Sequence, residues 1–365
     1  MTSSLGMVWP VEGVLLQMTP KPTMRTVAAK AGVSIATVSR VINCPDEVPT
    51  ETVERVRAAM AYLKYRPNMN GRRLKMAQTR SVGVLVPTMA NPVFATSVQG
   101  IEQAAHEDGL TVLLTSSEYD PERELGAVST LLNNRVDGLI LTLANADDNR
   151  VIDLLISENI PFVLLFNQPS RTDVASISVD NAKSAYDITQ AMIAQGHRKL
   201  AMVAGHFESS DRSRQRYDGF CQALRDATSD GTSSIAAPRL CQVGFGETDL
   251  EGILESFLTG PDVVTGLVCS TDMLAIAAIS ACRTYGLSVP GDVSVGGIDG
   301  IAVGGLITPK LCSAVQPTQK MGQQALAFLL GLIRGQTEPQ SLLLPHQLST
   351  GESIGPARHQ SSPRL

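Results

Sequence analysis

The chain carries two different patterns of hydrophobic and polar positions, which meet near residue 80. Before that point, apolar residues recur at i, i+3 and i+4 spacing in three short stretches, which predicts three short helices. After Ser81, short apolar runs bounded by polar or turn residues alternate with longer amphipathic stretches. We therefore expect a small all-helical module followed by a much larger α/β region.

The three short helices should begin and end at recognisable residues. The first runs from about Met24 to Ala31, with Thr23 as a cap and Gly32 as its end. The second follows Ser34, and the third follows Pro49-Thr50. Ten residues are expected to form their shared core: Val27, Ala28, Ala31, Val38, Val41, Ile42, Val53, Val56, Met60 and Leu63. So small a core is marginal in isolation.

The alternation after Ser81 predicts parallel sheets covered by helices on both faces. Strands are expected at 82–86, 110–114, 138–143, 162–166, 200–204, 267–269 and 293–295, and helices at 92–108, 121–134, 181–195, 212–227 and 271–285. This is too much chain for one comfortable sheet, so we expect two doubly wound lobes. Ligands of such folds bind at the carboxyl ends of the strands, here in a cleft between the lobes.

The second short helix, residues 34–43, has an unusual outward face. Opposite its buried stripe lie Ile35, Ala36, Ser39, Arg40 and Asn43, with no carboxylate among them. Small, hydroxyl, amide and guanidinium groups on one helix face suit the major groove of DNA.

The distribution of charge along the chain also distinguishes the helical module from the α/β region. The chain of 365 residues is 43% hydrophobic and 18% charged, which is ordinary for a folded protein, and its net charge is −5. Residues 24–80, however, hold eleven Lys and Arg against four acids, a net +7, and residues 81–365 carry −12. A basic head on an acidic body directs the head toward phosphates.

Other features exclude several classes of protein. The six cysteines show no C-x-x-C pair and the five histidines no metal-ligand spacing, which favours reduced, buried thiols in a cytoplasmic protein without a metal or cofactor. No apolar stretch is long enough for a membrane span. Residues 1–23 lack the basic start of a secretory signal, and we expect a disordered or misassigned tail with Met18 or Met24 as the true start.

At this point the residues resemble a known family, the lactose-repressor/galactose-repressor (LacI/GalR) bacterial transcription regulators. The resemblance covers about residues 24–350 and rests on landmarks in the family's order: Val27-Ala28, Ala31-Gly32-Val33-Ser34, Ala36 to Asn43, Tyr65-Arg66-Pro67-Asn68, Leu74, Ser81-Val82-Gly83-Val84, Asn91-Pro92-Val93-Phe94, Gly196-His197-Arg198, Arg216-Tyr217-Asp218-Gly219-Phe220, Asp272-Met273-Leu274-Ala275, Pro290 to Asp299 and Gln316-Pro317.

The resemblance implies a helix-turn-helix head and a two-lobed domain similar to periplasmic binding proteins, crossed three times by the chain. It implies a DNA-binding domain at 24–66, a hinge helix and linker at 67–80, and an effector-binding and dimerisation domain at 81–350. Lobe 1 would comprise about 81–178 and 314–343, and lobe 2 about 179–313 and 344–350, followed by a flexible tail at 351–365.

By the same resemblance, Ile35, Ala36 and Arg40 stand where the family reads bases, and Arg40 has the chemistry to bridge guanine O6 and N7. Ile35 could instead be a staple that packs on its own helix. The residues that look like contacts to the DNA backbone are Ser34, Thr37, Asn43, Thr52, Tyr65, Asn68 and Lys75.

Residues 68–75 resemble the family's hinge helix, in which Leu74 would wedge into the minor groove. On the residues alone this stretch is a linker or a helix that forms only in a complex. Two departures suggest a head that orders less readily without DNA. Gly71 replaces the usual alanine, at about 1 kcal/mol of helix propensity, and Thr26 replaces the acid that completes the first capping box.

The resemblance also places a set of residues at the cleft. They are Asn91, Phe94, Phe166, Asn167, Arg212, Arg216, Phe245, Thr271, Asp272, Asp299 and Gln316. Aromatic rings would stack on a small polar ring while Arg216 and Asp299 bind its hydroxyls. Phe94 could equally be ordinary core, and the spacing around Phe245 is longer than usual.

Three arginines at 212, 214 and 216 raise the question of an anionic effector, such as a sugar acid, phosphate or phosphonate. The alternative is that Arg214 pairs with a carboxylate and Arg212 is solvated.

The interpretation that follows is a repressor that is not an enzyme. It would bind palindromic operator DNA as a homodimer and respond to a small-molecule effector. Two alternatives are a doubly wound enzyme with an incidental basic arm, and an exported solute-binding protein. No G-x-G-x-x-G, P-loop, G-x-S-x-G or H-E-x-x-H motif supports an enzyme. The missing secretory signal argues against export.

Overall fold

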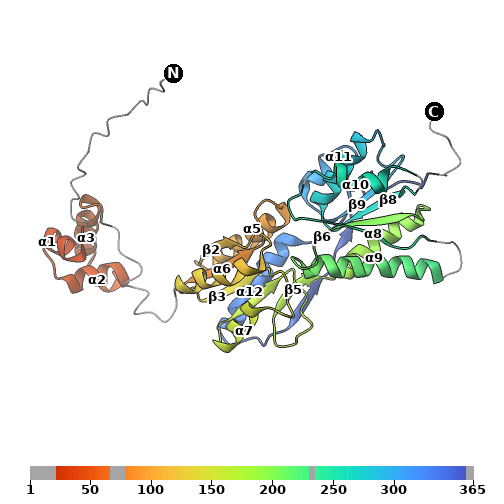
Figure 1. The fold of residues 1–365 in the computed structure, drawn as a ribbon. Coiled ribbons are helices and arrows are strands. Elements are labelled where there is room, and N and C mark those ends of the chain that lie inside the picture. The colour runs from red at the N-terminus through yellow and green to blue at the C-terminus, as the bar shows by residue number, and fades with distance from the viewer. Residues whose placement is uncertain (1–21, 66–78, 230–234, 248, 261, 359–365) are drawn as a thin grey trace, which may run out of the picture. The chain divides into compact units, whose positions relative to one another are not determined.

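A computed structural model describes residues 22–65, 79–229, 235–247, 249–260 and 262–358. The chain forms two compact units, Met1–Ala77 and Gln78–Leu365, and each is described by itself (Figure 1).

The described part of the first unit is a cluster of short helices, α1 (Met24–Ala31), α2 (Ile35–Asn43), the 3₁₀ turn η1 (Pro45–Glu47) and α3 (Thr50–Tyr62). Eight residues form its buried core: Val27, Ala28, Ala31, Val38, Val41, Val53, Val56 and Ala59. The expected core residues Ile42, Met60 and Leu63 are partly buried at its edge, whereas Ala59 was not anticipated.

The start of α1 corrects one expectation. Thr23 caps the helix, and its Oγ1 accepts from the Thr26 N–H at 3.3 Å. Thr26 closes the capping box itself, because its Oγ1 accepts from the Thr23 N–H at 2.8 Å and donates to the Thr23 carbonyl at 2.7 Å. A short hydroxyl side chain therefore replaces the acid without leaving this terminus open. The helix ends at Gly32, whose φ of 63° suits a residue without Cβ.

The second unit contains two six-stranded sheets, one in each lobe (Figure 1). In lobe 1 the strand order is β11-β5-β4-β3-β1-β2, and all neighbours are parallel. The strands are β1 (Ser81–Val86), β2 (Thr111–Ser116), β3 (Gly138–Leu141), β4 (Phe162–Leu165), β5 (Ser176–Val179) and β11 (Ser341–Leu344).

Lobe 2 repeats the plan with the order β12-β10-β9-β8-β6-β7, in which only the pair β10–β12 is antiparallel. The strands are β6 (Leu200–Gly205), β7 (Arg239–Val243), β8 (Gly266–Cys269), β9 (Ser294–Asp299), β10 (Cys312–Val315) and β12 (Gln347–Leu348). The fold expected from the alternating pattern is confirmed.

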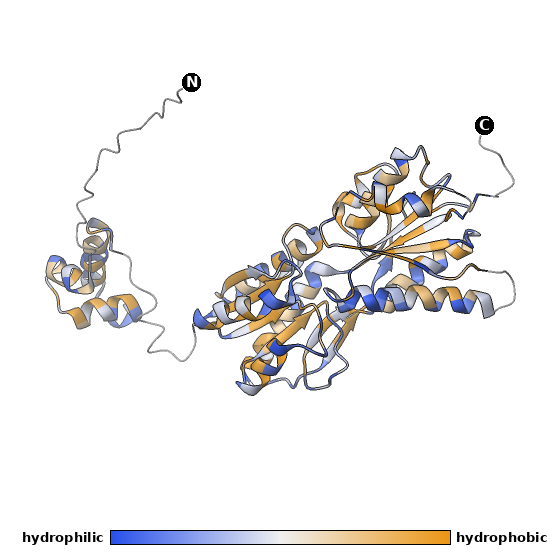
Figure 2. Cartoon of the chain, in the orientation of Figure 1, coloured by the Kyte–Doolittle hydropathy of each residue, from blue (hydrophilic) through white to orange (hydrophobic). Residues whose placement is uncertain are grey.

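Helices cover both faces of each sheet. Those of lobe 1 are α5 (Pro92–Glu107), α6 (Pro121–Asn133), α7 (Arg150–Ser157) and α12 (Thr318–Ile333), and those of lobe 2 are α8 (Asn181–Ala194), α9 (Asp211–Ser229), α10 (Glu251–Leu258), α11 (Asp272–Thr284) and the 3₁₀ turn η2 (Ala302–Gly305). Every strand and helix range expected from the hydrophobic pattern overlaps one of these elements. Orange segments are frequent in the strands in Figure 2, and the helices carry both orange and blue segments, as expected for helices with one buried face.

Three connections join the lobes, after β5, between β10 and α12, and between β11 and β12. The lobe limits differ slightly from those expected. Ala314 and Val315 pair with β9 in lobe 2, and Leu344 pairs with Val179 in lobe 1, because each of these strands stays in its own sheet to its last residue.

The expectation of a flexible tail after residue 350 is wrong for 351–358, which pack on lobe 2. The Ser353 side chain is fully buried, and its Oγ accepts from the Cys312 N–H at 2.8 Å. The Ala357 N–H donates to the Gln195 carbonyl at 2.8 Å, and Arg358 pairs with Asp292. The segment is held because it supplies hydrogen bonds to strand ends that would otherwise lack partners.

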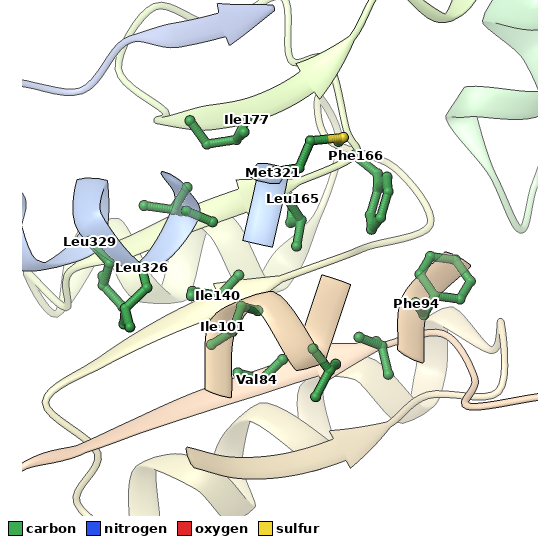
Figure 3. Packing of buried hydrophobic residues seen from close by; sticks show 14 of the residues in the cluster. Val84, Phe94, Ile101, Ile140, Leu165, Phe166, Ile177, Met321, Leu326 and Leu329 are labelled. Atoms are coloured by element: carbon green, nitrogen blue, oxygen red, sulfur yellow. The ribbon is translucent and has the colours of Figure 1, made fainter. Parts of the chain in front are cut away.

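One hydrophobic core of lobe 1 lies between its sheet and the pair α5 and α12 (Figure 3), and a second lies between the sheet and the pair α6 and α7. Val84, Ile140 and Leu165 from the sheet meet Ile101 of α5 and Leu329 of α12. At one end of this core Phe166 and Phe94 lie side by side, with ring centroids 5.4 Å apart. The hydrophobic core therefore reaches the carboxyl ends of the strands, where the candidate site lies.

Five of the six cysteines are buried and unpaired, as expected, but Cys44 is exposed.

Candidate functional site

Helix α2 presents the face that the sequence predicts. Ser34 caps the helix by accepting from the Thr37 N–H at 3.0 Å, and Val38 and Val41 are buried beneath it. Ile35 is 44% exposed, so the structure does not support the alternative that it is a staple packed on its own helix. Ala36, Arg40 and Asn43 are exposed as well.

The remaining predicted DNA contacts differ in accessibility. The hydroxyls of Ser34 and Thr37 lie 2.8 Å apart, and Asn43 Nδ2 donates to Ser39 Oγ at 3.1 Å. Thr52 is half-buried, and Tyr65 packs against the edge of the core. The proposed hinge residues lie outside the described residues: Asn68, Gly71, Leu74 and Lys75.

The positive charge of the head is available to a partner. Among residues 22–65 every Lys and Arg is exposed, and no ion pair with a carboxylate forms within this range. Lys30 Nζ lies 4.2 Å from the ring centroid of the exposed Tyr62. This arrangement leaves the cations free to approach phosphates.

The second candidate site is a cavity of about 20 Å³ between the lobes, large enough for one or two water molecules. It lies at the carboxyl ends of strands from both sheets, where doubly wound folds bind ligands. Its lining includes nine of the eleven residues predicted at the cleft: Asn91, Phe94, Phe166, Arg212, Arg216, Phe245, Thr271, Asp299 and Gln316. Val93, Tyr119, Ser210 and Ser213 complete it.

Asn167 and Asp272 do not line the cavity. The Asn167 amide exchanges hydrogen bonds with the backbone of Leu143, at 3.0 and 2.9 Å, and donates to Asp211 at 2.9 Å. Asp272 accepts from the N–H groups of Gly300 and Ile301, at 2.7 and 2.8 Å. Both side chains are fully buried and fix loops behind the site.

Arg216 and Asp299 form a buried pair on the wall of the cavity, with Nη1 and Oδ1 3.4 Å apart. Arg216 Nε donates to Asn181 Oδ1 at 3.0 Å, and its Nη1 donates to the Ser270 carbonyl. Burial lowers the pKa of Arg216 and raises the pKa of Asp299 to about 7, against the opposing effect of the Arg216 charge. The carboxyl is therefore poised to exchange a proton near neutral pH.

Four aromatic rings gather at the cavity, and one of them, Tyr119, was missed by the sequence analysis. Its ring stacks on Phe245 with centroids 3.9 Å apart and an interplanar angle of 8°. Tyr119 belongs to lobe 1 and Phe245 to lobe 2, so this stack bridges the lobes. The signal was available, because Tyr119 follows β2 at the same sheet edge as the other site residues.

Phe245 comes close because β6 ends in a glycine. A Cβ placed on Gly205 would lie 2.1 Å from the Phe245 ring. Only glycine at this strand end lets the ring lie against the backbone. The longer spacing after Phe245 therefore does not remove it from the site.

Backbone strain collects around the cavity. Tyr119, Phe166 and Asp299 have positive φ values of 60°, 73° and 135°, which non-glycine residues rarely adopt. Such conformations persist where the surrounding structure imposes them, and they cluster at functional sites. Here they occur at three residues that line the cavity, each at or shortly after the end of a strand.

A larger cavity of about 330 Å³ adjoins the inner cavity. It shares Asn91, Tyr119, Phe245 and Thr271 with the inner cavity, and Glu118 and Glu247 are among its other residues. The Tyr119–Phe245 stack therefore lines both cavities.

The three arginines of α9 have different surroundings. Arg212 is buried beside Asp211, with Nη1 and Oδ1 3.2 Å apart, and its Nη1 donates to the Leu143 carbonyl at 2.7 Å. Arg214 is exposed, and its guanidinium lies 4.2 Å from the ring centroid of Phe207. Neither matches the alternative of a solvated Arg212 and an Arg214 paired with a carboxylate.

Within the described ranges, no group of three His, Cys, Asp or Glu side chains is arranged to hold a metal ion. The described helices include none that is both long and apolar enough to span a bilayer.

Two family models match the chain. Residues 23–68 match the bacterial regulatory proteins of the lacI family, and residues 79–352 match the periplasmic binding proteins and sugar binding domain of the LacI family. The two matches fall on the two units of the structure.

Curated relatives match over nearly their whole length. The chain is 32% identical to the HTH-type transcriptional regulator GntR of Escherichia coli K12, over 92% of this chain and 99% of that protein. It is 30% identical to catabolite control protein A of Priestia megaterium, over 91% of this chain and 98% of that protein.

A solved structure agrees. The lac repressor dimer bound to operator and the anti-inducer ONPF superposes with a TM-score of 0.77 at 29% identity, over 92% of this chain and all of that one. These relatives are transcription regulators, which removes the enzyme alternative. The chain belongs to the LacI family of bacterial transcription regulators and is a DNA-binding regulator with a two-lobed, periplasmic-binding-protein-like domain.

Proposed function

We propose that the chain is a homodimeric repressor whose α2 enters the major groove of a palindromic operator. Ile35, Ala36 and Arg40 are the exposed side chains that would contact base edges. Ser34, Thr37, Asn43, Thr52 and Tyr65 would contact phosphates and fix the register of the helix. The dimer and the operator come to this proposal from the lac repressor structure, which is a dimer bound to operator. A repressor that meets its operator in a bacterium acts in the cytoplasm.

We further propose that a small polar effector binds in the cavity between the lobes. One observation carries this proposal: the cavity is built from both lobes at once. Asn91 and Phe166 come from lobe 1, and Arg216 and Asp299 come from lobe 2. A molecule that contacts both walls will bind some lobe arrangements better than others, and only such differential affinity shifts a conformational equilibrium.

The Tyr119–Phe245 stack is a contact between the two lobes that could change with the arrangement of the lobes. The inner cavity is too small for a sugar-sized molecule, so the effector must part the two rings or move the lobes to enter. Because one ring belongs to each lobe, entry of the effector changes the contact between them. We expect this change to alter operator affinity.

The experiment is a binding titration of the full chain against duplexes from its own promoter region, with a shuffled duplex as control. We expect preference for one palindromic duplex, a steep loss of affinity with salt, and a change in affinity when an effector is added. Equal affinity for all duplexes would overturn operator recognition. An effector that binds without changing operator affinity would overturn the proposed coupling.

A further inference from the structure

Two buried polar atoms on the wall of the inner cavity have no hydrogen-bond partner among the described residues. They are Arg212 Nη2 and Asp299 Oδ2. Arg212 is 5% exposed and Asp299 is 3% exposed, so bulk solvent does not satisfy them. Both residues line the same cavity. Because buried polar atoms are nearly always paired, this donor and this acceptor mark places for ligand atoms.

The direction of Arg212 Nη2 is fixed by the rest of its guanidinium. Nη1 donates to the Leu143 carbonyl of lobe 1 at 2.7 Å and to Asp211 Oδ1 at 3.2 Å. Asp211 is itself held, since its carboxylate accepts from Asn167 Nδ2 at 2.9 Å and from the Ala146 N–H at 3.0 Å. The guanidinium is planar, so fixing one side sets the direction of the other. Nη2 is a preorganised donor.

Asp299 is held in a similar way, but its unpartnered atom is an acceptor, whereas that of Arg212 is a donor. Its Oδ1 accepts from Gln316 Nε2 at 2.9 Å and from Arg216 Nη1 at 3.4 Å. Its Oδ2 has no hydrogen-bond partner among the described residues, and a carboxylate oxygen accepts a hydrogen bond from a hydroxyl.

Arg212 is the cation of the cavity whose carboxylate partner lies outside the cavity lining. The cations are Arg212 and Arg216, and the carboxyls nearest to them are Asp211 and Asp299. The Asp211 carboxylate accepts hydrogen bonds from lobe 1 and pairs with Arg212, and Asp211 does not line the cavity.

We propose that the effector is a small polyhydroxy carboxylate, a sugar acid, whose carboxylate accepts from Arg212 Nη2 and whose hydroxyl donates to Asp299 Oδ2. This assignment rests on the proposed function of the cavity as the effector site. Phe94, Phe166, Tyr119 and Phe245 supply apolar faces for the carbon chain. The unpartnered Arg212 Nη2 is a charged donor, and a carboxylate oxygen is a strong acceptor for it.

Arg212 would also link recognition to lobe arrangement. Its guanidinium joins α9 of lobe 2 to the end of β3 in lobe 1 through the Leu143 carbonyl. A carboxylate on Nη2 therefore acts on the same side chain that ties the lobes together.

The test is a calorimetric and thermal-shift titration of the full chain with matched probes: gluconate and galacturonate beside glucose and galactose, with glucose 6-phosphate as a third class. We expect at least one of the two sugar acids to bind at least tenfold more tightly than its neutral counterpart. Arg212→Gln should lose this preference, while Arg212→Lys should keep part of it. Arg214→Gln, on the same helix but exposed, is the matched control and should bind as the wild type does.

Urea unfolding of each variant checks that the fold is intact. Tighter binding of a neutral sugar or of glucose 6-phosphate, or an acid preference that survives in a folded Arg212→Gln variant, would overturn the sugar-acid assignment. So would the absence of binding by every probe. If a neutral sugar binds and alters operator affinity, the assignment falls while the proposed function stands. If a sugar acid binds through Arg212 without altering operator affinity, the assignment stands and the proposed coupling falls.

Discussion

Helix α2 and the interlobe cavity both carry recognition residues, but they are built in opposite ways. On α2 the residues come from one stretch of ten, and their side chains are exposed, with Ile35 at 44%. In the cavity the residues come from strand ends and helices of both lobes, and Arg216 of α9 is 5% exposed. Exposed side chains recognise a partner without supporting the fold, whereas buried ones do both.

The two sites also differ in how their charges are held. The Lys and Arg side chains among residues 22–65 are exposed and form no ion pair with a carboxylate in that range, which leaves them accessible to phosphates. In the cavity Arg212 and Arg216 are each fixed by a carboxylate and a backbone carbonyl. Substitutions in the head should therefore change DNA binding without changing the free energy of unfolding. Substitutions in the cavity should change both effector binding and the free energy of unfolding.

The largest expected effect is that of Arg216→Ala. The substitution leaves Asp299 buried without its cation and removes hydrogen bonds to Asn181 and Ser270. Breaking such a pair costs about 3–5 kcal/mol, which urea unfolding of the second unit would measure. Arg214→Ala is the matched control on the same helix and should cost less than about 1 kcal/mol. Equal losses would show that the buried pair does not stabilise the lobe.

A second test concerns the pH dependence of stability. The pKa of Asp299 is about 7 in the folded chain and 3.8 in the reference state. Between these values the unfolded chain has lost the proton that the folded chain retains, so Asp299 makes stability fall as pH rises from about 4 to 7. Asp299→Asn, which keeps the neutral form, should remove this fall, by up to about 1.4 kcal/mol per pH unit.

Urea unfolding at several pH values measures this difference, with Asp218→Asn as a control that removes an exposed carboxyl of α9. Identical pH profiles for Asp299→Asn and the wild type would contradict a raised pKa for Asp299.

Arg40→Ala tests base reading by the head. We expect a loss of about 1–3 kcal/mol of discrimination at one base pair of the operator, with no change in unfolding, because Arg40 is exposed. Arg57→Ala on α3 is the control, and any effect it has should be alike for all duplexes. The measurement is competition binding with single-base variants of the operator. A uniform loss in Arg40→Ala would make Arg40 a phosphate contact instead.

The smallest effect concerns the capping box of α1. Thr26→Ala removes the acceptor of the Thr23 N–H, and we expect α1 to lose about 1 kcal/mol. Amide exchange in α1 of the full chain should then be about fivefold faster by mass spectrometry. Thr26→Glu should restore protection, since a glutamate in this position completes the same box. Unchanged exchange in Thr26→Ala would show that Thr26 contributes nothing to the cap.

The sequence predicted most of the residues that line the cavity, but it wrongly included Asn167 and Asp272 and omitted Tyr119. Asn167 and Asp272 follow strands as the true lining residues do, and their residue types are equally suitable. Only the packing shows that their side chains already form hydrogen bonds, Asn167 with Asp211 and a backbone N–H group and Asp272 with two backbone N–H groups. Tyr119 was overlooked because its loop carries no motif, and its partner Phe245 lies more than a hundred residues away.

By itself the sequence determined the features that depend on local spacing: the capped helices of the head, the outward face of α2, and the alternation that makes two doubly wound sheets. Periodicity and capping act over a few residues, so they can be read directly from the chain. The tertiary structure decided which buried polar atoms keep a partner and which, like Arg212 Nη2 and Asp299 Oδ2, have none. That outcome depends on the simultaneous placement of both lobes, because hydrogen bonds between distant segments form only once the segments are packed together.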